Sequence, residues 1–267
     1  MTPEEYIREL AAAITQQEDI TDAEAKEVLY ELALRIYALL LRELPDSRFE
    51  RYLRWPQIRR ELLPWLFEAN RTLSQLILSR VAAMETIVIG PVERMFGLGP
   101  GRVLPRPLTD VLDETTVVGV RLSQLFAPAP VTGIPPFVTQ LLQLLERSVI
   151  GMFFDDPTTP EVARRVLEVR TRAGRDVPVV TKGTVANAWR ERVRSITAAV
   201  LWAVTTPAAE RAAQVARQDG LIEIVRWRWD AVLDPKTCPR CRPLDGQIER
   251  EILDFPEGPP PLHPLCR

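Results

Sequence analysis

The sequence has one histidine and three cysteines among its 267 residues. Three cysteines at one end of the chain do not suit a disulfide framework, so a reducing compartment such as a cytoplasm is expected. A Ser/His/Asp catalytic set would need His263, which lies beside the cysteines. Asp155-Asp156 precedes a proline and is typical of a turn, and Gly97–Gly101 lacks the Lys-Ser/Thr of a phosphate loop. We therefore expect no enzymatic activity.

Long uncharged apolar runs are also missing. Arg, Glu or Asp interrupts the apolar stretches every few residues, so the sequence predicts no membrane span. The N-terminus has no charged segment followed by an apolar core, so it does not resemble a signal peptide. Lysine is rare among the 34 basic residues, and 36 acidic residues bring the net charge to -2. The molecule as a whole is therefore not an obvious nucleic-acid binder.

The composition does supply a core, because 46% of the residues are hydrophobic. Over the first 220 residues these recur at spacings of three and four, which is typical of amphipathic helices. Pro, Gly and capping Thr residues divide this pattern. The first part of the chain is expected to hold a helix from Thr2 with a second start at Thr21 and an end at Pro45, a helix after Pro56 towards Ile87 with a kink or break at Pro64, and a loop at Gly90–Pro107. The middle part is expected to hold a connector at Ala127–Pro136, a helix at Pro135–Phe154, a hinge and cap at Asp155–Pro160, and a helix at Glu161–Arg172. Two more helices are expected after it, one from Thr181 to near Pro207 and one at Ala208–Gln218 that stops at Gly220.

The period of the pattern changes after Gly220. From Ile222 to Asp230, apolar and charged residues largely alternate, which predicts a strand with one buried face. Gln247–Ile252 is its expected partner, with Asp245 and Gly246 in the turn between the strands. The predicted fold is mainly α-helical with a small C-terminal β-hairpin, an α+β arrangement.

The single histidine and all three cysteines lie in the last thirty positions. Random placement would produce this clustering roughly once in several thousand trials. Cys238 and Cys241 form one hook, and His263 and Cys266 form a second. Two such hooks supply the tetrahedral ligand set that Zn²⁺ prefers, and four protein ligands leave no open position for catalysis. The sequence therefore predicts a structural zinc ion, which contributes about 10–16 kcal/mol in isolated peptides.

Two other interpretations apply to this region. Cys-x-x-Cys can be a thioredoxin-like redox pair, but that motif opens a helix in a βαβ unit, and here it follows a strand. Arg226 and Arg228 alternate with tryptophans, and Arg240 and Arg242 flank Cys241. These four arginines are candidate contacts for nucleic acid or a protein partner. For the first pair we favour the other explanation, a strand that packs its tryptophans on the helices and exposes its arginines.

The order of residues in the tail is similar to the C-terminal signature of a phage family. The matching elements are Asp234, then Cys238-Pro-Arg-Cys241, then Leu244-Asp-Gly246, and finally Pro260-Pro-Leu-His263-Pro-Leu-Cys266-Arg267. Residues 181–267 resemble the Mu F-like head-morphogenesis, or minor head protein, family of tailed bacteriophages. The expected division of the chain is a helical body at 1–155, a hinge and connector helix at 156–180 and the Mu F-like domain at 181–267.

The resemblance implies a minor capsid protein at the portal vertex that acts in head assembly, DNA packaging or DNA delivery. Its implied partners are the portal protein, the major capsid or scaffold protein and packaged DNA, with several copies in each virion and no membrane in the mature head. The implied location is the capsid interior, after synthesis in the host cytoplasm. A zinc-knuckle nucleic-acid-binding protein is the alternative function.

Overall fold

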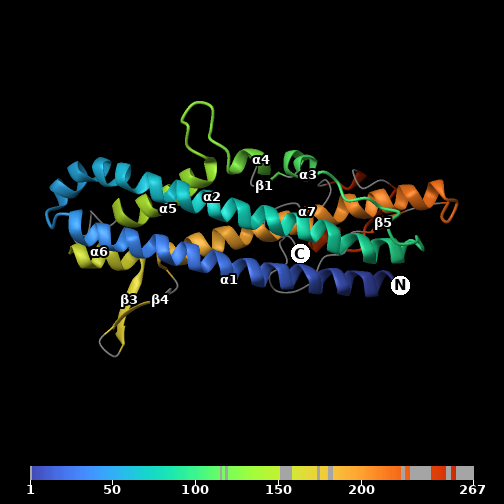
Figure 1. The fold of residues 1–267 in the computed structure, drawn as a ribbon, viewed down its shortest axis with the longest axis horizontal. Coiled ribbons are helices and arrows are strands. Elements are labelled where there is room, and N and C mark those ends of the chain that lie inside the picture. The colour runs from blue at the N-terminus through green and yellow to red at the C-terminus, as the bar shows by residue number, and fades with distance from the viewer. Residues whose placement is uncertain are drawn as a thin grey trace. The chain divides into compact units, whose positions relative to one another are not determined.

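The computed structural model describes residues 2–114, 116–117, 120–150, 158–172, 175–179, 183–223, 226–228, 242–250 and 254–256. Three long helices carry most of the described chain (Figure 1). The elements are α1 (Pro3–Glu43), α2 (Arg48–Met95), α3 (Leu108–Glu114), β1 (Thr116–Val117), β2 (Val120–Arg121), α4 (Leu122–Leu125), α5 (Pro136–Ile150), α6 (Thr159–Val166), β3 (Glu168–Arg172), β4 (Arg175–Val179), α7 (Val185–Gln218), β5 (Trp227–Arg228), the 3₁₀ turn η2 (Arg242–Leu244) and β6 (Ile248–Glu249). The predicted mainly helical fold is confirmed.

Helix α1 begins and ends where the sequence predicts. The backbone N–H of Thr2 donates to the carboxylate of Glu5 at 2.8 Å, and the N–H of Glu5 donates to the Thr2 hydroxyl at 3.2 Å. This reciprocal arrangement is a capping box. The predicted second start at Thr21 is wrong, because α1 continues through this residue, which is buried. The apolar stripe runs on without interruption, so packing holds the helix together across a residue that would otherwise favour a cap.

Helix α2 is longer than predicted at both ends. It begins at Arg48, passes through Pro56 and Pro64 without a break, and continues beyond Gly90 to Met95. A proline inside a helix costs about 3 kcal/mol, whereas each buried Leu, Ile or Val stabilises by about 1.5–3 kcal/mol. The buried stripe therefore outweighs the prolines; its members are Ile58, Leu62, Leu66, Leu73, Ile77, Val81, Met84, Val88 and Val92.

The segment Phe49–Met95 of α2 also contains an 18-residue window with a mean hydropathy of 1.4 and no more than two charged residues. By length and composition, this is the one helix within the described residues that is apolar enough to cross a membrane. A core helix of a soluble protein passes the same test. The buried stripe of α2 is such a core face.

Helix α7 (Val185–Gln218) is one continuous helix where the sequence predicts two. The predicted end near Pro207 is wrong, because α7 runs through Pro207 to Gln218. Its predicted stop at Gly220 is confirmed. Gly220 has a φ of 71°, and the N–H of Leu221 donates to the carbonyl of Ala216 at 2.9 Å. This pair of features is a Schellman motif, which needs a residue without a Cβ at the left-handed position.

Contacts divide the chain into two compact units. Unit 1 comprises residues 1–20, 78–123 and 195–267, and unit 2 comprises residues 21–77 and 124–194. Each of the three long helices, α1, α2 and α7, has one part in unit 1 and the other part in unit 2.

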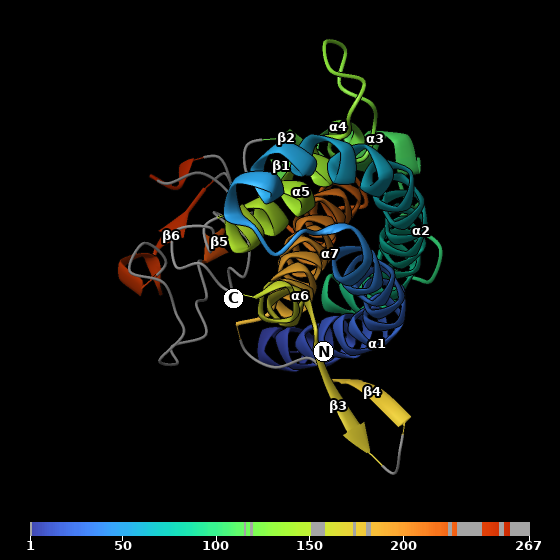
Figure 2. The same cartoon turned by 90° about the vertical axis from the view of Figure 1, so that its left-hand side faces the viewer.

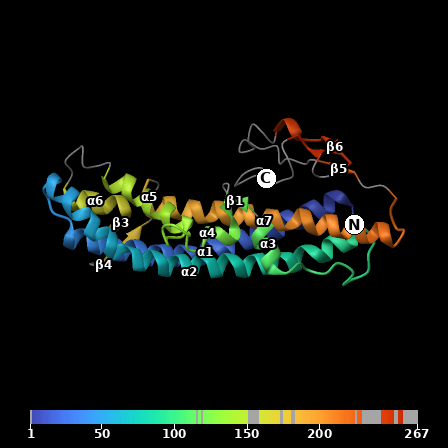
Figure 3. The same cartoon turned by 90° about the horizontal axis from the view of Figure 1, so that it is seen from above.

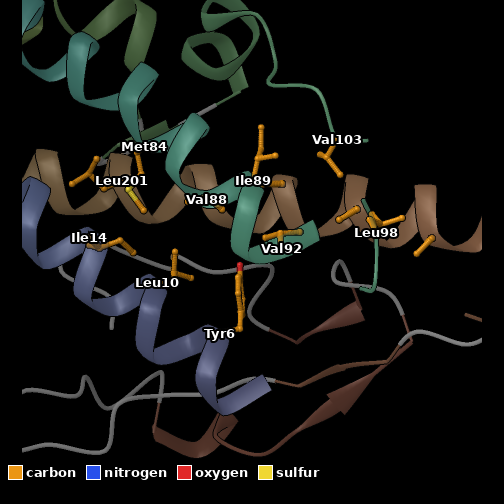
Figure 4. Close-up of a cluster of buried hydrophobic side chains, with 13 residues drawn as sticks. Tyr6, Leu10, Ile14, Met84, Val88, Ile89, Val92, Leu98, Val103 and Leu201 are labelled. Atoms are coloured by element: carbon orange, nitrogen blue, oxygen red, sulfur yellow. The ribbon is translucent and has the colours of Figure 1, made fainter. Parts of the chain in front are cut away.

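The core of unit 1 lies between parts of α1, α2 and α7 (Figure 4). Tyr6, Leu10 and Ile14 come from α1 and meet Met84, Val88, Ile89 and Val92 of α2. Helix α7 presents Leu201 and three alanines, Ala208, Ala212 and Ala216. Alanines at spacings of four form a narrow face, which lets neighbouring helices approach closely. Burial raises the pKa of the Tyr6 hydroxyl well above its usual range.

The core of unit 2 combines the long helices with α5 and α6. The Trp189 side chain of α7 is fully buried, and its Nε1–H donates to the carbonyl of Leu141 in α5 at 2.9 Å. Thr159, the first residue of α6, donates from its hydroxyl to the carbonyl of Leu44 at 3.1 Å and to the Asp46 carboxylate at 2.8 Å. These bonds attach α5 to α7, and α6 to the turn between α1 and α2.

Helix α6 is shorter than the predicted helix at Glu161–Arg172. Its start agrees with the predicted cap, since the N–H of Thr158 donates to the Glu161 carboxylate at 2.7 Å. The helix ends at Val166, and Glu168–Arg172 forms strand β3 instead. Strand β3 pairs antiparallel with β4, and this two-stranded ribbon extends away from the helices of unit 2 (Figure 2). Charged residues that alternate with Val and Thr favour a strand, and the helical interpretation missed this alternation.

The connector between α4 and α5 agrees with the predicted Pro-rich segment. Phe126 and Phe137 stand at its two ends with their rings edge to face, 5.2 Å between centroids. The side-chain amide of Asn70 donates to the carbonyl of Phe126 at 3.1 Å. At the tip of the loop, Val131 is 96% exposed. The loop is therefore closed at its base and open to solvent at its apolar tip.

Candidate metal centre and charged positions

The four predicted zinc ligands, Cys238, Cys241, His263 and Cys266, lie outside the described residues, as does Arg240. Within the described part of the chain, no group of three or more His, Cys, Asp or Glu side chains is placed to hold a metal ion. The chemistry of the donor set carries the assignment, because three thiols and one imidazole suit Zn²⁺. The zinc centre accordingly stays a prediction from the sequence.

The residues that flank the predicted metal hooks are described in part. Strand β5 pairs antiparallel with β6, with Trp227 opposite Glu249 and Arg228 opposite Ile248 (Figure 3). This pair joins the two segments in which the sequence predicts strands. Strand β5 precedes the first hook in the sequence, and β6 lies between the two hooks.

Asp245 and Gly246 occupy a hydrogen-bonded turn just before β6. The N–H of Gln247 donates to the carbonyl of Leu244 at 3.0 Å, and Gly246 has a φ of 78°. Leu244 itself is buried, although the residues on both sides of it are exposed. The turn therefore needs Gly246 for its backbone conformation, and Leu244 anchors it.

The candidate contact arginines Arg226, Arg228 and Arg242 are all exposed. Acidic residues lie among them, since Glu249 faces Trp227 across the strand pair and Asp245 follows Arg242 by three residues. The described part of this module presents mixed charge.

Two buried glutamates of α2 form a site that the sequence analysis missed. Glu93 accepts backbone hydrogen bonds from Gly101 at 3.2 Å and from Val103 at 2.8 Å. Glu85 accepts from the backbone N–H of Arg106 at 3.1 Å and from the guanidinium of Arg211 at 2.5 Å. Both carboxylates thereby hold the Gly- and Pro-rich segment after α2 against the helix. No local motif marks such residues, because their partners are fixed only by the tertiary fold.

Asp22 and Arg190 form a second charged contact, within unit 2. The Nε–H of Arg190 donates to Asp22 Oδ1 at 2.7 Å, and a second bond joins Arg190 Nη2 to Asp22 Oδ2. The hydrogen bond from Arg190 lowers the pKa of Asp22, and the same bond raises the pKa of Arg190. Nearby, Arg192 donates to Gln140 at 2.9 Å, and burial lowers the pKa of its guanidinium. The bond to Asp22 joins α7 to α1, and the bond to Gln140 joins α7 to α5. These charged side chains therefore hold the helices of unit 2 together.

Comparison with known proteins gives no relative. No family model matches this chain, and no curated protein and no solved structure matches it.

Proposed function

We propose that this chain is a minor head protein of a tailed bacteriophage, associated with the portal vertex, with its C-terminal tail clipped by a structural zinc ion. The observation that carries the proposal is the ordered tail pattern, from Cys238-Pro-Arg-Cys241 through Leu244-Asp-Gly246 to His263-Pro-Leu-Cys266-Arg267. The β5–β6 strand pair and the Asp245-Gly246 turn support it, because they lie next to the predicted metal hooks in the sequence. In this role the protein takes part in head assembly, DNA packaging or DNA delivery.

The zinc ion would supply a cross-link and no reaction. Cys238, Cys241, His263 and Cys266 would hold it, and a closed four-ligand shell leaves no position for substrate. The tail is rich in proline, and the segment 251–267 has few apolar residues to bury. A metal cross-link offsets the conformational entropy that such a tail loses on folding.

Two exposed apolar surfaces of unit 2 suit docking onto a larger assembly. On the first turns of α2, Phe49, Tyr52 and Leu53 are 71%, 67% and 61% exposed. Their spacing of three and four places them on one face of the helix. The Pro-rich loop with Val131 at its tip is the other surface. Exposed apolar clusters of this kind mark interaction sites more often than isolated apolar residues do.

The protein composition of purified phage heads tests the proposal. Heads purified from a culture that produces the phage or prophage encoding this chain should contain the protein at a constant ratio to the portal protein, measured by quantitative mass spectrometry. The purified full-length chain should also capture the portal protein of the same phage. A triple substitution of Phe49, Tyr52 and Leu53 to Ser probes the α2 surface, with Arg60→Gln on the same helix as a control. Absence of the protein from purified heads, with no capture of portal, contradicts the proposal.

The alternative function is a zinc-knuckle nucleic-acid-binding protein. Exposed Arg226, Arg228 and Arg242 favour it, whereas Asp245 and Glu249 in the same module weaken the local positive charge. Substitution of the three arginines by Gln separates the two functions. A head protein retains its place in the head, whereas a knuckle that binds nucleic acid through these residues loses salt-sensitive binding.

A further inference from the structure

The loop between α4 and α5 exposes apolar residues and carries no charge. From residue 122 to residue 145 the sequence has no Asp, Glu, Lys, Arg or His, in a chain of which 26% is charged. Burial of α4 and α5 explains part of this stretch, but loop residues 127, 128 and 130–133 are exposed. Val131 at the tip is 96% exposed. Exposed loops are ordinarily polar, so a role as a solvated connector does not explain this composition.

Bonds within the loop fix its conformation. The N–H of Gly133 donates to the carbonyl of Ala129 at 2.8 Å, which closes a turn of five residues with Val131 at its centre. Gly133 has a φ of 67°, a conformation that favours glycine. The N–H of Ile134 donates to the Thr132 hydroxyl at 3.3 Å. The one polar side chain among residues 127–134 is therefore used inside the loop.

The base of the loop is attached to the helices of unit 2. Phe126 and Phe137 pack edge to face across it, and Asn70 of α2 donates to the Phe126 carbonyl at 3.1 Å. Prolines at positions 128, 130, 135 and 136 restrict the backbone on both sides of the tip. The loop projects away from α5 (Figures 1 and 2). Such an ordered loop loses little conformational entropy on binding, and we call residues 127–134 the apolar prong.

The missing charge identifies the kind of surface that the apolar prong fits. An uncharged tip that covers an ionised group removes the water around that group and offers no partner, which is unfavourable. The complementary surface is therefore an uncharged, apolar pocket. Proline-rich segments dock in grooves lined by aromatic side chains, so aromatic residues suit the walls of this pocket.

Two other apolar environments suit the prong less well. Trp, Tyr, Lys and Arg anchor segments at a bilayer surface, and residues 122–145 contain none of them. A second copy of this chain offers shallow recesses on α1, but Asp19 lines one and Glu9 lines another. Either recess would place a carboxylate against the uncharged tip. These observations favour a different protein as the partner.

We infer that the apolar prong inserts into an uncharged, apolar pocket of the portal protein, with Val131 as its anchor. The identity of the partner rests on the proposed function, whereas the chemistry of the pocket follows from the prong. This contact is separate from the zinc-bound tail, because the prong lies in unit 2 and contains none of the predicted metal ligands.

The test is biolayer interferometry between the full-length protein and the purified portal protein of the same phage. Val131→Ser should weaken binding roughly 10- to 100-fold, because the apolar side chain that fills the pocket is lost. Val131→Asp should weaken binding by at least about 100-fold, because a carboxylate would be buried without a partner. The ratio of affinities between the unaltered protein and Val131→Ser should be the same at about 50 and 500 mM NaCl, since the contact contains no ion pair.

The matched control is Leu104→Asp, which introduces the same charge at an apolar residue that is 74% exposed in unit 1. It should bind the portal protein as the unaltered protein does, and all variants should unfold at the same temperature. Normal binding by Val131→Asp, or an equal loss in Leu104→Asp, overturns this inference and leaves portal association intact. If the unaltered protein does not bind the portal protein, the proposed portal association fails together with the inference.

Two parallel measurements cover the other occupants. Co-sedimentation with vesicles of phosphatidylethanolamine and phosphatidylglycerol should show no binding that depends on Val131. Analytical ultracentrifugation should show no self-association that Val131→Asp abolishes. Vesicle binding that is lost in Val131→Asp would make the prong a membrane-inserting loop, and self-association that is lost would make a second copy its partner. Either result overturns the inference.

Discussion

The contact between Asp22 and Arg190 gives the sharpest stability prediction. Asp22→Asn removes the charge and replaces one acceptor oxygen by a donor, which faces the Arg190 guanidinium. The side chains of Asp22 and Arg190 are 18% and 31% exposed, so solvent screens the pair only partly. A hydrogen bond to a charged group contributes about 1.5–3 kcal/mol when buried, and partial exposure reduces this to about 1–2 kcal/mol. We expect the free energy of unfolding to fall by that amount at pH 7.

The matched control is Glu31→Gln, which breaks the pair between Glu31 and Arg35 on the surface of α1. These side chains are 67% and 42% exposed, so solvent screens the pair and the expected loss is much smaller than that for Asp22→Asn. Urea unfolding followed by circular dichroism measures both variants. A double-mutant cycle with Arg190→Gln isolates the coupling between the two side chains. Equal losses for Asp22→Asn and Glu31→Gln would refute the assignment of a partly buried, bidentate contact.

The pH dependence of this loss follows from the lowered pKa of Asp22. The folded-state pKa lies below the unfolded value of about 3.9, so the ionised form is favoured in the folded protein. The stabilisation is therefore complete above about pH 5 and disappears as the pH falls through the folded-state pKa. The difference between the unaltered protein and Asp22→Asn should be constant from pH 7 to about pH 5 and should shrink below about pH 4. A difference that grows on acidification would contradict this sign.

Three further substitutions test the packing. Glu93→Ala should cost about 2–4 kcal/mol and abolish hydrogen-exchange protection of the Val103 amide, because its acceptor is removed, whereas unchanged protection would refute the contact. Trp189→Phe should cost about 1–2 kcal/mol through loss of the bond to Leu141 and of buried area, and an unchanged unfolding midpoint would refute it. Pro207→Ala should stabilise the protein by about 1–2 kcal/mol if α7 is continuous, and destabilisation would favour the predicted break.

Local signals in the sequence were sufficient where a few neighbouring residues decide the structure. Thr2 with Glu5 and Thr158 with Glu161 cap their helices through bonds within one turn, and Gly220 ends α7 through its own backbone conformation. Such features are visible in a stretch of four or five residues. The helix starts and stops that depend on them were predicted correctly.

Tertiary packing decided the rest. Pro64 and Pro207 are local signals for a break, but the buried stripes that continue on both sides hold α2 and α7 together. Glu85 and Glu93 look like ordinary helix residues until the segment after α2 folds back onto them. The β3–β4 ribbon was interpreted as helix because five-residue strands leave a weak periodic signal. The zinc ligands lie outside the described residues, so that part of the site remains a prediction.

The zinc content of the purified full-length protein tests the central claim most directly. After purification in a reducing buffer without added metal, elemental analysis by mass spectrometry should find about one zinc ion per chain. Substitution of both Cys238 and Cys241 by Ser should remove that zinc, because it takes away one complete hook. Less than about half an equivalent in the unaltered protein, or full zinc content in the double variant, would contradict the zinc-clipped tail.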